Sequence, residues 1–132
     1  MKYLPVLFLM VSYSCSEPEV ENNNPLLGEW QLIEILSDPG NGSGVFVPVE
    51  SDKYLLFNSD NVVNTNGSFC RFGHGDVGDN DSGEYSIETN MITPVDCLFD
   101  FGGIRFELND SVLELSYLCD EACLEKYIVK ML

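Results

Sequence analysis

The chain has 132 residues, of which 22 are acidic and six are basic, so its formal net charge at pH 7 is −16. A surface this acidic repels nucleic-acid phosphates and anionic lipid headgroups, which argues against binding nucleic acid or membranes through surface charge. Hydrophobic residues make up 45% of the chain and aromatic residues 11%, which is too many for a disordered acidic tail. The length leaves room for one folded domain with a small core, preceded by a targeting segment.

The first fourteen residues have the layout of a secretory signal peptide. Lys2 supplies an early positive charge, and residues 4–11 form an apolar stretch. This stretch is shorter than the roughly 20 residues that a helix needs to cross a bilayer. The residues before Cys15 resemble a lipobox, in which the cysteine becomes the lipid-modified first residue, although Ser12 stands where lipoboxes usually carry leucine. An ordinary secretory cleavage site after Ser14 is the alternative.

The cysteine count favours lipidation. If Cys15 is the anchor, four cysteines remain, an even number that suits two disulfides in an oxidising compartment. A plain secreted protein would keep an odd, exposed thiol. We therefore expect a lipid-anchored protein of the bacterial cell envelope, most naturally at the outer membrane. Residues 15–25 carry no hydrophobic period and form a flexible acidic tether, which is either a signal for export to the cell surface or a polar spacer.

The rest of the chain, residues 26–132, is predicted to be a single all-β domain. No segment keeps a 3.6-residue apolar period for three turns, and short apolar segments alternate with clusters of Asn, Asp, Gly and Ser. Consecutive short strands joined by tight turns indicate an antiparallel meander, which loses its exposed edges if it closes into a barrel. The expected strands cover residues 27–36, 54–58, 62–66, 83–88, 91–93, 104–109, 112–118 and 124–131.

The end of the chain suggests how the cysteines pair. Residues 113, 115 and 117 alternate with polar residues, and the same parity places Cys119 on the inner face. Three residues separate Cys119 from Cys123, so the two can flank a tight hairpin turn at the Cα separation that a disulfide requires. This pairing leaves Cys70 with Cys97. The two other pairings of the four cysteines remain open.

The sequence Leu27-Gly28-Glu29-Trp30 at the start of the domain resembles the Gly-x-Trp motif of lipocalin-like, calycin-type barrels. Residues 57–60 and 83–87, together with the two late cysteines, extend this resemblance to small bacterial lipocalin-like lipoproteins. The resemblance implies an antiparallel up-and-down barrel of about eight short strands, with Trp30 closing one end and the glycine-rich residues 37–52 lying over the mouth. A weaker resemblance, through Cys70, Gly83-x-Tyr85 and Cys97, is to META-type domains of bacterial envelopes.

Two features could carry chemistry. His74 is the only histidine, and no recognisable nucleophile motif lies beside it. We therefore expect that the protein is not an enzyme. Asp79, Asp81 and Glu84 present alternating oxygens around a glycine, a pattern that could bind Ca²⁺. The pattern lacks the rest of an EF-hand, and a solvated acidic loop is the alternative.

The remaining candidates concern a ligand. Residues 97–103 combine large apolar side chains with a diglycine, which could form a mobile lip at a cavity or a loop folded over the core. The leading hypothesis is a non-enzymatic envelope lipoprotein that holds a small apolar ligand against Trp30, Phe99 and Phe101. In the alternative, the core is filled, Trp30 is a core plug, and the module serves a structural or protein-binding role.

Overall fold

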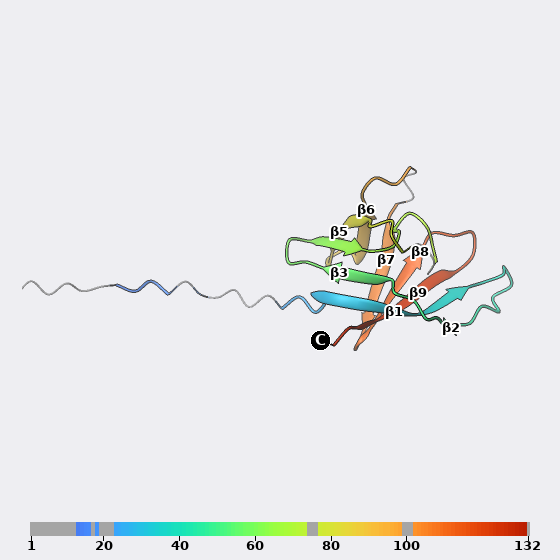
Figure 1. Ribbon diagram of the computed structural model, residues 1–132, viewed down its shortest axis with the longest axis horizontal. Helices are drawn as coiled ribbons and strands as arrows, with labels where there is room; N and C mark the ends of the chain where they lie inside the picture. The colour runs from blue at the N-terminus through green and yellow to red at the C-terminus, as the bar shows by residue number, and fades with distance from the viewer. Residues whose placement is uncertain (1–12, 17, 19–22, 74–76, 99–101, 132) are drawn as a thin grey trace, which may run out of the picture.

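The computed structural model of the chain describes residues 13–16, 18, 23–73, 77–98 and 102–131, and within them all regular structure is β (Figure 1). No helix among these residues is long and apolar enough to cross a membrane. The strands of the described residues are β1 (Gly28–Ser37), β2 (Val47–Pro48), β3 (Tyr54–Phe57), β4 (Val62–Thr65), β5 (Ser82–Ser86), β6 (Met91–Pro94), β7 (Ile104–Asn109), β8 (Val112–Tyr117) and β9 (Cys123–Val129).

The strands form one closed antiparallel barrel. From β3 to β9 each strand pairs with the next in the chain, and β3 also pairs with β1. The barrel closes because β9 pairs with β1, from Trp30 opposite Val129 to Ser37 opposite Cys123, with a bulge between Leu32 and Glu34. The eight strands β1 and β3 to β9 therefore make an up-and-down barrel, and the predicted fold is confirmed.

Strand β2 is an addition to the prediction. It lies within the segment expected to be a long loop, and it pairs with the second half of β1 through Glu34 opposite Pro48 and Ile35 opposite Val47. Two residues, one of them a proline, show no alternating pattern, so only the spatial neighbour reveals this strand. The other boundaries differ from the expected ones by a few residues at strand ends.

The period-2 pattern of the sequence explains which side chains fill the barrel. In β8, for example, Leu113, Leu115 and Tyr117 point inward, while the residues between them are half-buried on the outer face. Trp30 is 1% exposed, and its indole Nε1 donates a hydrogen bond to the carbonyl oxygen of Leu26 at 2.8 Å. Trp30 therefore plugs the barrel where the chain enters it.

The two ends of the barrel differ. At one end, which we call the tight-turn end, short connections join β3 to β4, β5 to β6 and β7 to β8. Asn61, Asn90 and Asp110 adopt positive φ there, as residues that tolerate the left-handed region do in hairpin turns. At the other end, the disulfide end, longer connections carry the Cys70–Cys97 and Cys119–Cys123 disulfides. The predicted disulfide pairing is confirmed.

The glycine-rich loop after β1 is ordered by one carboxylate. Oδ1 of Asp38 accepts hydrogen bonds from the backbone N–H groups of Gly40, Asn41 and Gly42 at 2.8 to 3.1 Å. Oδ2 accepts a hydrogen bond from the backbone N–H of Gly44 at 2.8 Å. These bonds, chiefly the one from Gly44, lower the pKa of Asp38. The Asp38 backbone N–H also donates to the carbonyl oxygen of Ala122, so this loop lies beside the β8–β9 connection.

Candidate functional site

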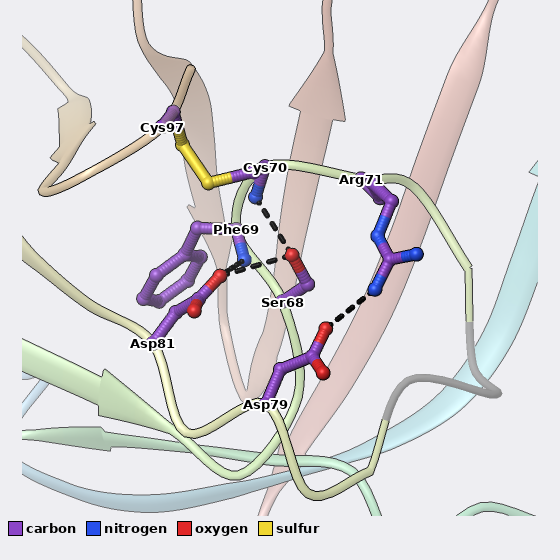
Figure 2. Close-up of a disulfide and its surroundings, with 7 residues drawn as sticks. All are labelled: Ser68, Phe69, Cys70, Arg71, Asp79, Asp81 and Cys97. Carbon is purple, nitrogen blue, oxygen red and sulfur yellow. Dashed lines mark hydrogen bonds and ion pairs between the residues drawn. A yellow bond between two sulfur atoms is a disulfide. The ribbon is translucent and has the colours of Figure 1, made fainter.

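At the disulfide end, one segment of the chain lies in the mouth of the barrel. It comprises residues 67–73, and we call it the mouth segment. It follows β4 and turns into the barrel, so that Phe69 is fully buried and belongs to the hydrophobic core. Oδ2 of Asp81 accepts hydrogen bonds from the Ser68 hydroxyl at 2.9 Å and from the Phe69 backbone N–H at 2.8 Å (Figure 2). The disulfide from Cys70 to Cys97 ties the segment to the β6–β7 connection (Figure 2).

Two opposite charges lie inside the barrel beneath this segment. Nζ of Lys53 is 3.0 Å from Oε1 of Glu125, and both side chains are 0% exposed. Lys53 comes directly before β3, and Glu125 lies on β9 between the inward-facing Cys123 and Tyr127. The tertiary fold thus brings together two residues that lie 72 positions apart in the sequence.

Further hydrogen bonds support the ion pair. Lys53 Nζ also donates to the carbonyl oxygen of Gly73 at 3.0 Å, and the Gly73 backbone N–H donates to Glu125 Oε1 at 3.3 Å. The Tyr127 hydroxyl donates to Glu125 Oε2 at 2.6 Å. We call Lys53, Glu125, Tyr127 and the Gly73 backbone the interior cluster. Such additional hydrogen bonds offset part of the cost of removing the two charges from water.

Gly67 and Tyr127 shape the surroundings of the ion pair. A Cβ atom on Gly67 would lie 2.9 Å from Cε of Lys53, so the absence of a side chain at Gly67 leaves room for the lysine stem. Burial raises the pKa of the Tyr127 hydroxyl well above its usual value of 10.0, and the nearby Glu125 carboxylate raises it further. Tyr127 therefore stays a neutral donor to Glu125.

The sequence prediction missed this cluster, because Lys53 and Glu125 are residue types that usually face solvent. One signal was present at Glu125. It occupies the inward parity of β9, with Cys123 and Tyr127 on either side, and a carboxylate at that position needs a buried cation. The position of Lys53, outside any strand, carries no comparable signal.

A small pocket opens beside the mouth segment. Its volume is about 120 Å³, and it is lined by Cys70, Phe72, Tyr117, Leu118 and Cys119. The Phe72 and Tyr117 rings meet edge to face with centroids 5.7 Å apart. Leu118 in the lining is 72% exposed, and Leu98, next to the half-cystine Cys97, is 93% exposed.

Larger hollows lie elsewhere on the barrel. One of about 500 Å³ is at the tight-turn end and is lined mainly by exposed polar side chains, among them Asp60, Glu84 and Glu88. Another, of about 530 Å³, lies beside β1 and the segment between β2 and β3, including Gln31, Glu50 and Asp52. Their linings are more polar than that of the small pocket.

Of the residues predicted to contact a ligand, Trp30 alone lies within the described part of the chain. Trp30 lies near the tight-turn end, seven residues along β1 from Ser37, which is about 23 Å at the usual rise of a strand. None of the three pockets is lined by Trp30. Phe99 and Phe101 lie outside the described residues, as does His74. Their neighbour Cys97 belongs to the disulfide end, opposite Trp30.

The three carboxylates of the predicted Ca²⁺ site have separate environments. Asp79 pairs with Nη2 of Arg71 at 2.6 Å, while Asp81 holds the mouth segment (Figure 2). Glu84 lies on β5 with its side chain exposed. Across the described residues, no group of three or more His, Cys, Asp or Glu side chains is placed to hold a metal ion. The structure therefore does not assemble the predicted site.

Residues 26–115 match the family described as the lipocalin-like domain. This match covers more than half of the chain, so the protein belongs to the lipocalin-like domain family. No curated protein and no solved structure matches the chain. The weaker resemblance to META-type domains stays a prediction.

Replacement of Lys53 by methionine should strongly destabilise the fold. The substitution leaves the Glu125 carboxylate buried without its cation, a change that typically costs about 3–5 kcal/mol. Denaturant unfolding followed by tryptophan fluorescence measures this loss. Lys130→Met is the matched control, because the Lys130–Glu29 pair is partly exposed to solvent and should contribute little to stability. Equal effects of the two substitutions would contradict a structural role for the interior pair.

Alkaline pH should weaken the fold through Tyr127. Because its pKa is raised in the folded state, the stability it contributes is fully present below pH 10.0, the ordinary pKa of the group, and is lost as the pH rises toward the folded-state pKa. The free energy of unfolding, measured in urea from about pH 8 to pH 12, should therefore fall more steeply for the wild type than for Tyr127→Phe. Parallel curves would show that Tyr127 ionises alike in both states.

Proposed function

We propose that this protein is a lipid-anchored module of the bacterial cell envelope that binds an apolar group at the disulfide end of its barrel. The observation that carries the proposal is the pocket lined by Phe72, Tyr117 and Leu118, of which Leu118 is 72% exposed. An accessible pocket lined mainly by apolar and aromatic side chains, on an otherwise acidic protein, is a candidate site for an apolar group.

A binding role fits the chemistry of this end better than catalysis does. Lipocalin-like domains are typically non-enzymatic binding folds. In the interior cluster, the lysine, the carboxylate and the tyrosine hydroxyl are engaged with one another and with Gly73. Groups engaged in this way support the fold, and we place none of the three in a catalytic role.

The size of the pocket limits what it holds. A cavity of about 150 Å³ accommodates benzene, so about 120 Å³ suits one small ring or a short branched alkyl group. Pockets that enclose a drug-sized ligand are larger, roughly 300–1,000 Å³. We infer that the pocket takes the apolar end of a ligand and leaves the rest outside the barrel.

A protein partner is the second candidate, and the filled core favours it. Sixteen apolar residues of the described chain form one buried cluster, and several of them are completely shielded from solvent. With the interior occupied in this way, recognition of a partner would take place on the outside, where Leu98 and Leu118 are exposed. An apolar side chain of the partner would then occupy the small pocket.

The anchor in this proposal is Cys15, which is exposed. Residues 15–25 form the tether and lead to Leu26, whose carbonyl oxygen accepts the hydrogen bond of Trp30 at the tight-turn end. The tether therefore joins the barrel at the end opposite the disulfide end. The two disulfides fit an oxidising compartment, which supports export and an outer-membrane location.

Replacement of Cys15 by serine should release the protein from the membrane. Without the thiol no acyl chain can be attached, so in a bacterial host the variant should appear in the soluble fraction, whereas the wild type sediments with membranes. Immunoblotting of the fractions and labelling with palmitate measure both effects. Ser16→Ala is the control and should behave as the wild type does. Equal sedimentation of Cys15→Ser and the wild type would contradict the anchor.

Benzene should bind the pocket beside Leu118. In a two-dimensional amide NMR titration of the mature wild-type domain, signals of Phe72, Tyr117 and Leu118 should shift, while that of Trp30 should not. Leu118→Ser should weaken the shifts at Tyr117, since it removes one apolar wall. Ile87→Ser is the matched control, because Ile87 is also partly exposed but lies at the tight-turn end. Shifts that are absent, or spread evenly over the barrel, would refute the proposed pocket.

A further inference from the structure

The mouth segment fills the interior of the disulfide end much as a bound molecule would. It contributes the fully buried ring of Phe69 to the core and packs the Phe72 ring against Tyr117. It also places the backbone of Gly73 on the interior cluster, where one N–H and one carbonyl oxygen bind Glu125 and Lys53. The segment therefore brings aromatic rings into the barrel, together with the uncharged backbone N–H and carbonyl groups of Gly73.

We propose that Lys53, Glu125 and Tyr127 of the interior cluster form a binding site for an uncharged amide carried next to an aromatic group, and that the chain's own Gly73 backbone, which follows Phe72, occupies this site. The external ligand would be a blocked peptide or a similar aromatic amide, bound when the mouth segment is displaced. The inference deepens the proposed function, on which it rests, by adding a second position at the same end of the barrel.

The charges of the cluster determine which chemical group of a ligand can bind there. Lys53 and Glu125 neutralise each other at 0% exposure, so the site as a whole has no charge to offer a ligand. A carboxylate entering beside Glu125, or an ammonium beside Lys53, would bring an uncompensated charge into a buried environment, at a high cost in free energy. An amide donates to Glu125 and accepts from Lys53 at once, as Gly73 does.

The mouth segment is held by the buried Phe69 ring, by hydrogen bonds to Asp81 and by the Cys70–Cys97 disulfide, and not by strand pairing. Residues 67–73 belong to none of the strands, so their departure breaks no pairing between strands. Gly73 has a φ of +141°, a conformation that other residues rarely adopt, and a Cβ atom there would meet nothing within 4 Å. Gly73→Ala therefore disfavours the bound backbone conformation without a steric clash.

The test compares the wild type with Gly73→Ala, using N-acetyl-phenylalanyl-glycinamide as the uncharged probe. The free dipeptide phenylalanyl-glycine, which carries the same groups with charged ends, is the matched control ligand. Calorimetric titration should show that Gly73→Ala binds the blocked peptide at least about tenfold more tightly than the wild type does, because the competing segment is weakened. The free dipeptide should show no gain.

Gly78→Ala is the control variant. Gly78 lies in the same β4–β5 connection, has a φ of +114° and likewise has no atom within 4 Å of a Cβ, but it does not contact the interior cluster. It should bind the blocked peptide as the wild type does. If Gly73→Ala fails to fold, Cys70→Ser/Cys97→Ser provides the second route, since it removes the covalent attachment of the segment, and Cys119→Ser/Cys123→Ser is its control.

Two results would overturn the inference. One is that the blocked peptide gains no affinity in either released variant, although hydrogen exchange shows the amides of Phe69 and Gly73 to be freed. The other is an equal gain in the control variants, which would indicate general loosening. Neither result depends on benzene: a missing shift at Leu118 in the wild type refutes the surface pocket, whereas a missing gain with the blocked peptide refutes only the interior site.

Discussion

Hydrogen bonding between β1 and β9 closes the sheet, and the arrangement of the interior depends on this closure. The register from Trp30 opposite Val129 to Ser37 opposite Cys123 sets which residues of β9 point inward. It places Glu125 inside the barrel, within 3.0 Å of Lys53. An open sheet would expose this carboxylate to water, and the lysine would gain nothing from burial. Closure therefore makes the interior ion pair possible.

The two ends of the closed barrel differ in structure and in proposed role. At its tight-turn end the strands are joined by short hairpin turns, and Trp30 plugs the barrel. The chain from the proposed anchor enters the barrel there. Its disulfide end carries the mouth segment, both disulfides and the exposed leucines. Stability at this end comes from covalent links and from a buried polar cluster, both of which tolerate irregular backbone. Irregular backbone is what places side chains around a pocket.

The interior cluster has a cost and a benefit for such a small domain. Well-packed apolar residues at the positions of Lys53 and Glu125 would often be equally stable or more so. The ion pair, however, holds Gly73 in one position through two directional bonds, which an apolar core cannot do. The cluster therefore specifies where the mouth segment lies, in addition to filling space.

The sequence alone predicted the all-β fold and the eight barrel strands, and it favoured the observed disulfide pairing while it left two other pairings open. These rest on local signals: alternation such as that of residues 113–117, turn residues such as Asn61 and Asn90, and the short spacing of Cys119 and Cys123. Only the tertiary structure decided the short strand β2, the union of Lys53 with Glu125 and the position of the mouth segment. Each of these depends on a partner distant in the sequence, and a local pattern carries no information about which distant residue will lie beside it.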